Sequence, residues 1–386
     1  MAAADPVPTD ARERRDVVVP VPGPEDPPER AWLVLPHRHP VPTLLDETRD
    51  AVVGLAETLA AVLPVTVLAH PRDAGAARLV PPEVDLLRAP VGSPLLGRTG
   101  PSFIRRPEGL AAVAWRSAAG LTGTGPLDGA AATAVAEAAG LPLLTPLLCA
   151  PRGAWVTDGE GTAVVAADPV LDGRINGAWT PGQVAAEFAA LLGITRVLWV
   201  PPAPRPDTGP WGGPGHLASW VRLQGDGEAA VHWRGDRFHP EHPYAAAALR
   251  FLQGADDAAG RPLRVRTVTG AAQPAAYDPA ERGPRSLLDT LPLGAAVLRP
   301  AFEDAAGEEA AAAACAALHP GLPQLSFPAP PLLRLAGALN DLVLLQPRPC
   351  PRPSRDRRRP RRPPRRGPHL PRARRSARPP GAGPRR

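Results

Sequence analysis

The chain has 386 residues, of which 44% are hydrophobic and 21% charged, so it can bury one large core or two ordinary ones. No apolar run approaches the ~18 residues that a membrane helix needs, and the opening stretch MAAADPVPTDARERRD lacks the apolar centre of a signal peptide. We therefore expect a cytoplasmic protein without membrane contact.

Basic residues are concentrated at the C-terminal end. The chain has 44 basic residues and no lysine, and sixteen of these arginines lie between Arg348 and Arg386 beside a single acidic residue, Asp356. The other 28 arginines share residues 1–347 with 37 acidic residues, so the body is negative and the tail is strongly positive.

This composition predicts disorder at both ends. Dense charge interleaved with proline cannot bury enough apolar surface to fold, so we expect disorder in residues 348–386 and in residues 1–24. The arginine tail could contact polyanions such as a phosphate backbone nonspecifically. An extension without any selected function is the alternative.

Between these ends one arrangement recurs five times in chain order. An alanine- and leucine-rich stretch with apolar positions three and four apart predicts a helix, and glycine or proline then releases the chain into a short apolar or β-branched run. The five stretches are AVVGLAETLAAVLPVTVLAH, AATAVAEAAGLPLLTPLL, VAAEFAALLGITRVLWVP, AAAALRFLQGADDAAGRPLRVRTV and EEAAAAACAALHPGLPQLSF. The strands that follow the helices begin near Val65, Leu143, Val197, Leu263 and Leu325.

Further runs with strand character lie between these stretches, namely GLAAVAW, GTAVVAAD, SWVRLQ and AAVHW. A doubly wound sheet would also alternate helix and strand, but it does not account for the added strands. The spacing of 54 to 78 residues between the predicted strands is longer than solenoid periods. The pattern favours a ring of small α/β modules, each unable to bury its sheet alone.

Six motifs in chain order resemble those of agmatine deiminases and the related bacterial peptidylarginine deiminases. PPERAWLVLPHR resembles their P-H-E-R-T-W-L-x-W-P, GRTGPSF resembles R-D-T-G-P-T-F, and DGEGTAVVAADPVLDGRIN resembles a segment that begins D-G-E-G-T. LLGITRVLWVP, GHLASWVRL and GALNDLVLLQP are similar to L-L-G-V-x-K-V-I-W-L-P, G-H-V-D-N-L-A-R-F and G-G-N-I-H-C-I-T-Q-Q-Q-P. The resemblance covers residues 25–347 and implies the fold of this family, a five-bladed α/β propeller (pentein).

The resemblance also implies a chemistry. In this family a cysteine thiolate attacks the guanidinium carbon of agmatine or peptidyl-arginine, ammonia leaves, and water hydrolyses the adduct to a ureido product. A histidine acts as general acid and base, and two carboxylates hold the cation. The reaction needs no metal or other cofactor and is linked to putrescine biosynthesis.

The residues at these positions differ from the family pattern. Asp341 stands where the nucleophile belongs, Arg98 and Ala218 stand where the two carboxylates belong, and His216 matches the family histidine. A carboxylate is a far poorer nucleophile than a thiolate, and an arginine repels a cationic substrate. Asp207 resembles the acidic residue expected just before the family Gly-His, displaced by an insertion. If Asp341 and Arg98 are neighbours, they can form an ion pair across the site.

The three cysteines do not restore the nucleophile. Cys149 and Cys315 lie in apolar contexts typical of small core residues, and Cys350 lies in the predicted tail. Far apart and odd in number, they fit neither a disulfide framework nor a zinc site.

The segment HWRGDRFHPEHPY gathers His232, His239, Glu241 and His242. Its spacing matches no helical metal pair, and its two prolines prevent one. We interpret it as a solvated loop, and we expect no metal site.

We therefore expect a degenerate member of this family that keeps the propeller and has lost the deiminase chemistry. The first alternative is an active hydrolase or transferase on a different, anionic ligand, with His216 and Asp341 or Asp207 as an acid/base pair and Arg98 binding a carboxylate or phosphate. The second is a non-enzymatic binding or scaffold protein. The expected partners are a small molecule in the central pocket, polyanions at the tail and a second copy of the chain.

Overall fold

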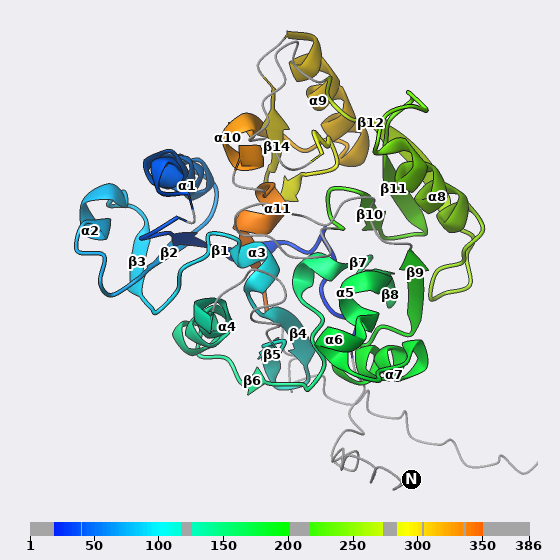
Figure 1. Cartoon of the computed structure of the whole chain (residues 1–386), viewed down its shortest axis with the longest axis horizontal. Helices are drawn as coiled ribbons and strands as arrows, with labels where there is room; N and C mark the ends of the chain where they lie inside the picture. The colour runs from blue at the N-terminus through cyan, green and yellow to red at the C-terminus, as the bar shows by residue number, and fades with distance from the viewer. Residues whose placement is uncertain are drawn as a thin grey trace, which may run out of the picture. The chain divides into compact units, whose positions relative to one another are not determined.

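Five small sheets surround a common centre in the computed structural model, within the residues that it describes. These are residues 19–39, 41–116, 126–200, 217–272, 284–302, 305–334 and 337–349. All of them belong to one compact unit, Met1–Cys350. Figure 1 looks down the centre of the ring and shows the long helices on its outside. The predicted five-bladed α/β propeller is confirmed.

Each sheet repeats the same order of strands. The inner strand is antiparallel to the second, which is parallel to the third, because a helix on the outside returns the chain to the same end of the sheet. The first sheet contains β16 (Leu344–Pro347), β1 (Pro28–Leu35), β2 (Val65–Ala69) and β3 (Asp85–Arg88), with α1 (Leu45–Ala60) between β1 and β2. Because β16 pairs with β1, the last strand closes the ring on the first.

The other four sheets each have three strands and one long connecting helix. The second and third are β4 (Ser102–Arg106), β5 (Gly109–Val113) and β6 (Leu143–Leu144) with α4 (Pro126–Ala138), and β7 (Trp155–Thr157), β8 (Thr162–Ala166) and β9 (Arg196–Val200) with α7 (Pro181–Leu192). The fourth and fifth are β10 (Val221–Gln224), β11 (Glu228–Trp233) and β12 (Arg264–Thr269) with α8 (His242–Gln253), and β13 (Leu291–Pro292), β14 (Val297–Ala301) and β15 (Gln324–Pro328) with α9 (Ala305–Leu318).

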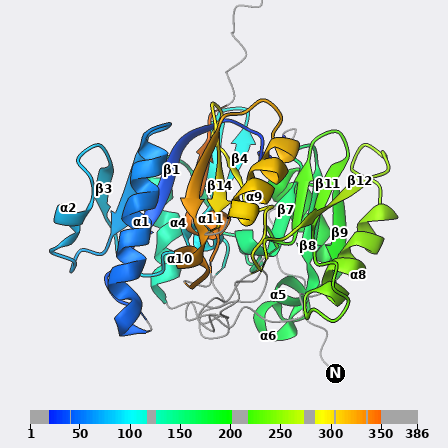
Figure 2. The same ribbon diagram turned by 90° about the horizontal axis from the view of Figure 1, so that it is seen from above.

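Short helices occupy the connections. They are η1 (Pro42–Leu44), α2 (Ala76–Leu79), α3 (Leu96–Thr99), η2 (Arg152–Ala154), α5 (Ala167–Leu171), α6 (Gly173–Asn176), α10 (Ala329–Arg334) and α11 (Leu339–Leu342). Figure 2, the view from above, shows the sheets standing side by side with α5, α6 and α10 toward one end. The five strands that were predicted to follow the long helices all begin within a residue of the expected position.

Helix α7 shows how the sequence produces one blade. Thr180 caps its first turn in a reciprocal capping box with Gln183, and Gly193 ends it in the left-handed conformation at φ 65°. Val184, Phe188 and Leu191 repeat at helical spacing and are buried. They pack on the fully buried strand β8, so this blade has its own apolar core between helix and sheet.

The folded body begins earlier than the sequence predicted. Val21 is buried in the core of the third blade, and its N–H donates to the Leu192 carbonyl oxygen at 2.7 Å. Residues 19–24 therefore belong to the body, and the expected disordered segment 1–24 is wrong at this end. A proline-rich segment without a core of its own can still pack on a surface that the blades provide. Residues 1–18 and the predicted tail from residue 350 lie outside the described residues.

The segment around His232 is not a solvated loop throughout. His232 lies in β11 and is fully buried, with its Nε2 3.1 Å from Oε2 of Glu241. Arg234 donates from Nε to the same oxygen at 3.0 Å. The interpretation of the whole segment as a loop was wrong because Pro240 and Pro243 lie after β11, at the start of α8, and do not interrupt the strand. Among the described residues, no group of three His, Cys, Asp or Glu side chains could hold a metal ion.

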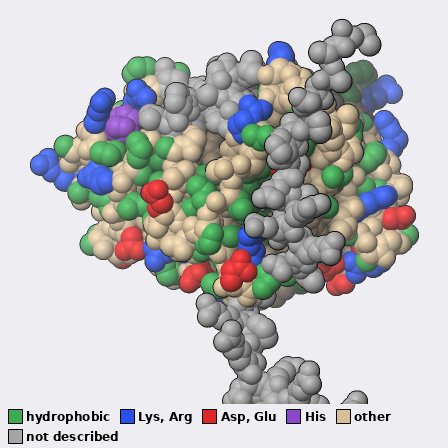
Figure 3. Space-filling model, turned by 90° about the horizontal axis from the view of Figure 1, so that it is seen from below, with side chains coloured by type: hydrophobic (Ala, Val, Ile, Leu, Met, Phe, Trp, Pro, Cys, Tyr) green, Lys and Arg blue, Asp and Glu red, His purple; other side chains and the backbone are tan. Residues whose placement is uncertain are grey.

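The surface carries both signs of charge. Figure 3 shows acidic, basic and apolar side chains intermixed over the coloured part of one face. Within the described parts of the chain, no helix has the length and apolar character that crossing a membrane requires.

Candidate functional site

A cavity of about 170 Å³ lies at the centre of the ring. Each innermost strand contributes to its wall, through Phe103, Thr157, Leu223, Leu291 and Leu345. The segment that precedes β1, residues 21–27, also lines it, and we call this segment the N-terminal strap. All five blades and the strap therefore meet at one place.

Two of the predicted site residues form a buried ion pair beside this cavity. Arg98, on α3, donates from Nε to Oδ1 of Asp341, on α11, at 2.7 Å, and from Nη2 to Oδ2 at 3.4 Å. Their side chains are only 9% and 2% exposed. Oδ2 of Asp341 also accepts the N–H of Ala338 at 2.8 Å. The carboxylate at the family nucleophile position is thus engaged through both oxygens.

Gly97 allows the two short helices to approach closely enough for this pair. A Cβ at position 97 would lie 2.1 Å from the carbonyl oxygen of Asn340 and 2.8 Å from that of Val343. Both neighbours are backbone atoms, which cannot swing away as a side chain can. The glycine before Arg98 therefore fixes the distance between α3 and α11.

We expect Gly97→Ala to lower the free energy of unfolding by about 1–3 kcal/mol, because the added methyl group overpacks this contact. Urea denaturation followed by circular dichroism measures the effect. Gly182→Ala in α7 is the matched control, since a Cβ there meets nothing within 4 Å and alanine favours a helix. Equal stability of the two variants would show that the close approach is not required.

Asp289 positions α11 from its N-terminal end. Its Oδ2 accepts the N–H of Leu339 at 2.6 Å, and its Oδ1 accepts the N–H and the side-chain amide of Asn340 at 3.0 and 2.6 Å. Burial raises the pKa of Asp289 to about 6, and the nearby charge of Asp341 acts in the same direction, against the hydrogen bonds from Asn340. The sequence analysis missed this residue, because an acidic residue in the apolar run SLLDTLPL matches no motif.

Ala218 lines the cavity from the turn before β10, so the structure brings it to the same place as Asp341. Its methyl group offers neither charge nor hydrogen bond to a bound cation. His216 and Asp207, the other two predicted site residues, lie outside the described residues. Of the five residues, three therefore lie at or beside the cavity, and their roles there remain proposals.

Two arginines that the sequence analysis did not single out also line the cavity. Arg152, at the start of η2, donates from Nε to the carbonyl oxygen of Gly97 at 3.3 Å. Burial lowers the pKa of Arg152 to about 10, so it remains a cation at neutral pH. Arg222, on β10, donates to both oxygens of Thr290 at 3.1 Å and to Glu25 of the strap at 3.1 Å.

Glu25 joins the strap to the fourth and fifth blades. Burial alone would raise its pKa, but the hydrogen bonds and charges of His319 and Arg222 outweigh burial and lower the pKa to about 2. A carboxyl group whose pKa falls on folding stabilises the fold above its unfolded pKa and loses that contribution as the pH falls. The relevant window runs from 4.5 down to about 2.

Glu25→Gln should therefore lower the thermal midpoint at pH 7, and its difference from the unmodified protein should narrow as the pH falls through that window. Differential scanning calorimetry over a pH series measures this. The surface variant Glu228→Gln, which removes an exposed pair with Arg264, serves as control. A difference that is independent of pH would contradict the assignment of the stabilisation to the Glu25 charge.

Neither described cysteine reaches the site. Cys149 is buried against Ile175, and Cys315 is buried on α9. Burial raises the pKa of the Cys315 thiol, which disfavours the nucleophilic thiolate. Neither residue lines the cavity, and Cys350 lies outside the described residues.

The fold and the axial site together define a protein of the pentein class. Among solved structures, the agmatine deiminase of Enterococcus faecalis superposes with a TM-score of 0.74 at 19% identity, over 85% of this chain and 96% of that chain. At this level of identity the likeness shows the fold.

Sequence comparison identifies the family. The profile of the Porphyromonas-type peptidyl-arginine deiminase family matches residues 21–343, and the chain belongs to that family. It is 33% identical over 251 residues to the "Putative agmatine deiminase" of Streptomyces coelicolor, covering 62% of this chain and 73% of that protein. It is 26% identical over 350 residues to the agmatine deiminase of Pseudomonas syringae pv. tomato, covering 84% and 94%.

Proposed function

We propose that this chain is a deiminase-family protein that has lost the deiminase reaction and kept the pentein scaffold. The observation that carries the proposal is the ion pair between Arg98 and Asp341. Two residues that align with a nucleophile and a substrate-holding carboxylate bind each other instead of a substrate.

The attacking group supports this proposal. A guanidinium carbon is a weak electrophile and requires a strong nucleophile such as a thiolate. The oxygens of Asp341 accept hydrogen bonds from Arg98 and from the Ala338 N–H, and these hydrogen bonds lower the nucleophilicity of the carboxylate. No cysteine side chain among the described residues lines the cavity.

The charge of the site supports it as well. A guanidinium substrate carries a fixed positive charge and needs acidic groups around it. The positions that align with its two carboxylates hold Arg98 and Ala218, and the guanidinium groups of Arg152 and Arg222 line the cavity wall. This cavity would therefore repel a cationic substrate, whereas the two carboxylates of the family pattern would attract it.

The relatives named above are agmatine deiminases, and the reaction of the family releases ammonia and leaves a ureido product. Hydrolysis of another ligand by a His216 acid/base pair is the less favoured function, because Asp341 is held by Arg98. Binding of an anion without chemistry has a specific observation in its favour, which is developed below. The cytoplasmic location, the homo-oligomer and the polyanion contact of the tail stay predictions.

An ammonia-release assay tests the proposal directly. The unmodified protein is incubated with agmatine, with free arginine and with an arginine-containing peptide, and ammonia is measured against a protein-free blank. We expect no release above the blank from any of the three. Sustained release from one of them would refute the proposal and identify the substrate.

A further inference from the structure

The charges around the axial cavity do not balance. Both described carboxylates that line it have an arginine partner: Asp341 is paired with Arg98, and Asp26 is paired with Arg105. Arg222 is paired with Glu25 of the strap. Within the described residues Arg152 has no such partner, and its one hydrogen bond is the 3.3 Å contact from Nε to the Gly97 carbonyl oxygen.

A partly buried guanidinium without a carboxylate partner is costly for a fold to retain. The lowered pKa of Arg152 expresses this cost, because burial opposes its charged form. Its terminal nitrogens Nη1 and Nη2 donate no hydrogen bond to any described residue. The side chain thus offers a charge and a planar pair of donors, the geometry that binds a carboxylate or phosphate through two hydrogen bonds.

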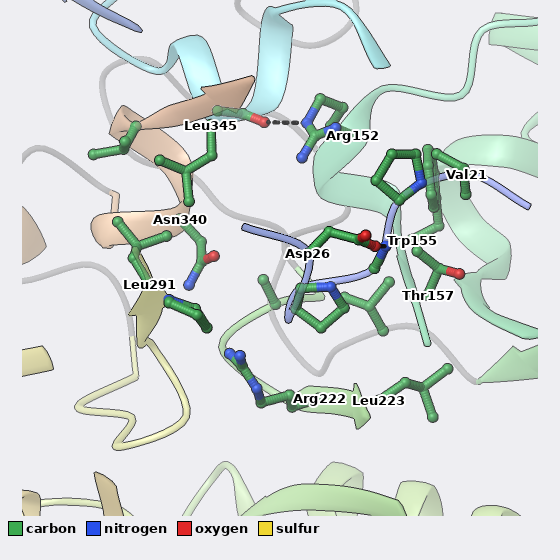
Figure 4. Close-up of a pocket in the computed structure, with 18 of the residues that line it drawn as sticks. Val21, Asp26, Arg152, Trp155, Thr157, Arg222, Leu223, Leu291, Asn340 and Leu345 are labelled. Atoms are coloured by element: carbon green, nitrogen blue, oxygen red, sulfur yellow. Dashed lines mark hydrogen bonds between the residues drawn. The ribbon is translucent and has the colours of Figure 1, made fainter. Parts of the chain in front are cut away.

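A second arginine faces the same space. Figure 4 shows the side chains of Arg152 and Arg222 pointing into the space between the strap, β10 and α11. The Arg222 side chain is 7% exposed, and its Nε is buried without a hydrogen-bond partner. The cavity therefore has guanidinium groups on two sides, with unused donors on Arg152 and a Glu25-paired charge on Arg222.

We propose that the axial cavity binds a small oxyanion, a carboxylate or a phosphate, with Arg152 as the principal ligand and Arg222 as the second cation. The volume of about 170 Å³ sets the size of this ligand, because pockets for drug-sized molecules span about 300–1,000 Å³. A nucleotide is too large, whereas inorganic phosphate or a short dicarboxylate fits. This inference does not rest on the loss of deiminase chemistry, since it concerns a charge that the deiminase reaction does not use.

Isothermal titration calorimetry of the full chain tests the proposal with two probes, inorganic phosphate and malonate, at constant ionic strength set with sodium chloride. We expect saturable binding of at least one probe, and the two titrations distinguish a phosphate site from a carboxylate site. Arg152→Gln should weaken that binding at least about tenfold, as the loss of one charge-assisted hydrogen bond implies. Arg174→Gln, which changes a 79% exposed arginine on α6, is the matched control and should bind as the unmodified protein does.

A thermal-shift series provides a second readout that does not depend on heat of binding. Without added anion, Arg152→Gln should melt at or above the temperature of the unmodified protein, because it removes a partly buried charge that has no carboxylate partner among the described residues. With the anion, only the unmodified protein and the Arg174→Gln control should gain stability. Arg152→Lys keeps the charge but not the planar pair of donors and should bind with intermediate affinity.

Three outcomes would overturn the proposal. They are the absence of saturable binding with both probes, equal affinity of Arg152→Gln and the unmodified protein, and an equal loss of affinity in the Arg174→Gln control. The last would indicate nonspecific attraction of anions to a basic chain.

Discussion

Asp341→Asn is expected to lower the free energy of unfolding by about 3–5 kcal/mol, the usual cost of removing one partner of a buried ion pair. Asparagine keeps an oxygen that can accept the Ala338 N–H, so the substitution removes the charge and little else. The guanidinium of Arg98, only 9% exposed, would then lose the carboxylate of Asp341. Urea denaturation at pH 7 measures the change.

Two further variants show that the effect comes from the pair. Adding Arg98→Met to Asp341→Asn removes the buried guanidinium charge as well and should recover a large part of the lost stability, so the two changes should not be additive. Glu228→Gln breaks an exposed pair with Arg264, whose side chain is 61% exposed, and should cost about 1 kcal/mol or less. If Asp341→Asn costs no more than Glu228→Gln, the pair is not a structural element of this fold.

The second large effect concerns restored chemistry. The triple variant Asp341→Cys, Ala218→Asp and Arg98→Asp returns the thiol and both carboxylates to the positions that the family motifs give them, and it alone should release ammonia from agmatine. Asp341→Cys by itself should remain inactive, because Arg98 would still repel the cation and Ala218 would still offer it no charge. Groups that act as one catalytic unit show this kind of non-additivity.

One control separates the restored carboxylates from the restored nucleophile. The double variant Ala218→Asp with Arg98→Asp has the restored walls without the thiol, and its inactivity would assign the gain to the nucleophile. Each variant is compared by circular dichroism with the unmodified protein before the assay. Activity in Asp341→Cys alone would show that Arg98 does not exclude the substrate.

The five blades could be predicted because their signals are local. Helical spacing in stretches such as VAAEFAALLG, followed by glycine and a β-branched run, specifies each helix and the strand after it without knowledge of the rest of the chain. The four further runs with strand character likewise form strands, namely β5, β8, β10 and β11. The spacing of these units favoured a ring, the resemblance implied a five-bladed propeller, and both agree with the observed sheets.

The site could be predicted only where a motif marked it. Arg98 and Asp341 were found because they interrupt recognisable motifs, and the contact between them followed from alignment. Arg152 and Asp289 lie outside such interruptions, and their importance depends on packing. Arg152 has no carboxylate partner among the described residues, and Asp289 accepts a hydrogen bond from the first N–H of α11.

The N-terminal boundary of the folded body could not be predicted from the sequence either. The strap has the composition of a disordered segment, yet Val21 is buried and Glu25 is held by Arg222, a residue nearly two hundred positions away. Composition reports what a segment can bury by itself. It does not report the surfaces that the rest of the fold offers to that segment.

The most direct test of the central claim is the ammonia assay on the unmodified chain, run beside the agmatine deiminase of Pseudomonas syringae as a positive control. Both proteins are given agmatine at equal concentration, and ammonia and the ureido product are quantified over several hours. The loss of deiminase chemistry predicts product from the control and none above the blank from this chain. Accumulation of both products in proportion to the amount of this protein would contradict it, and would place an active nucleophile elsewhere than Asp341.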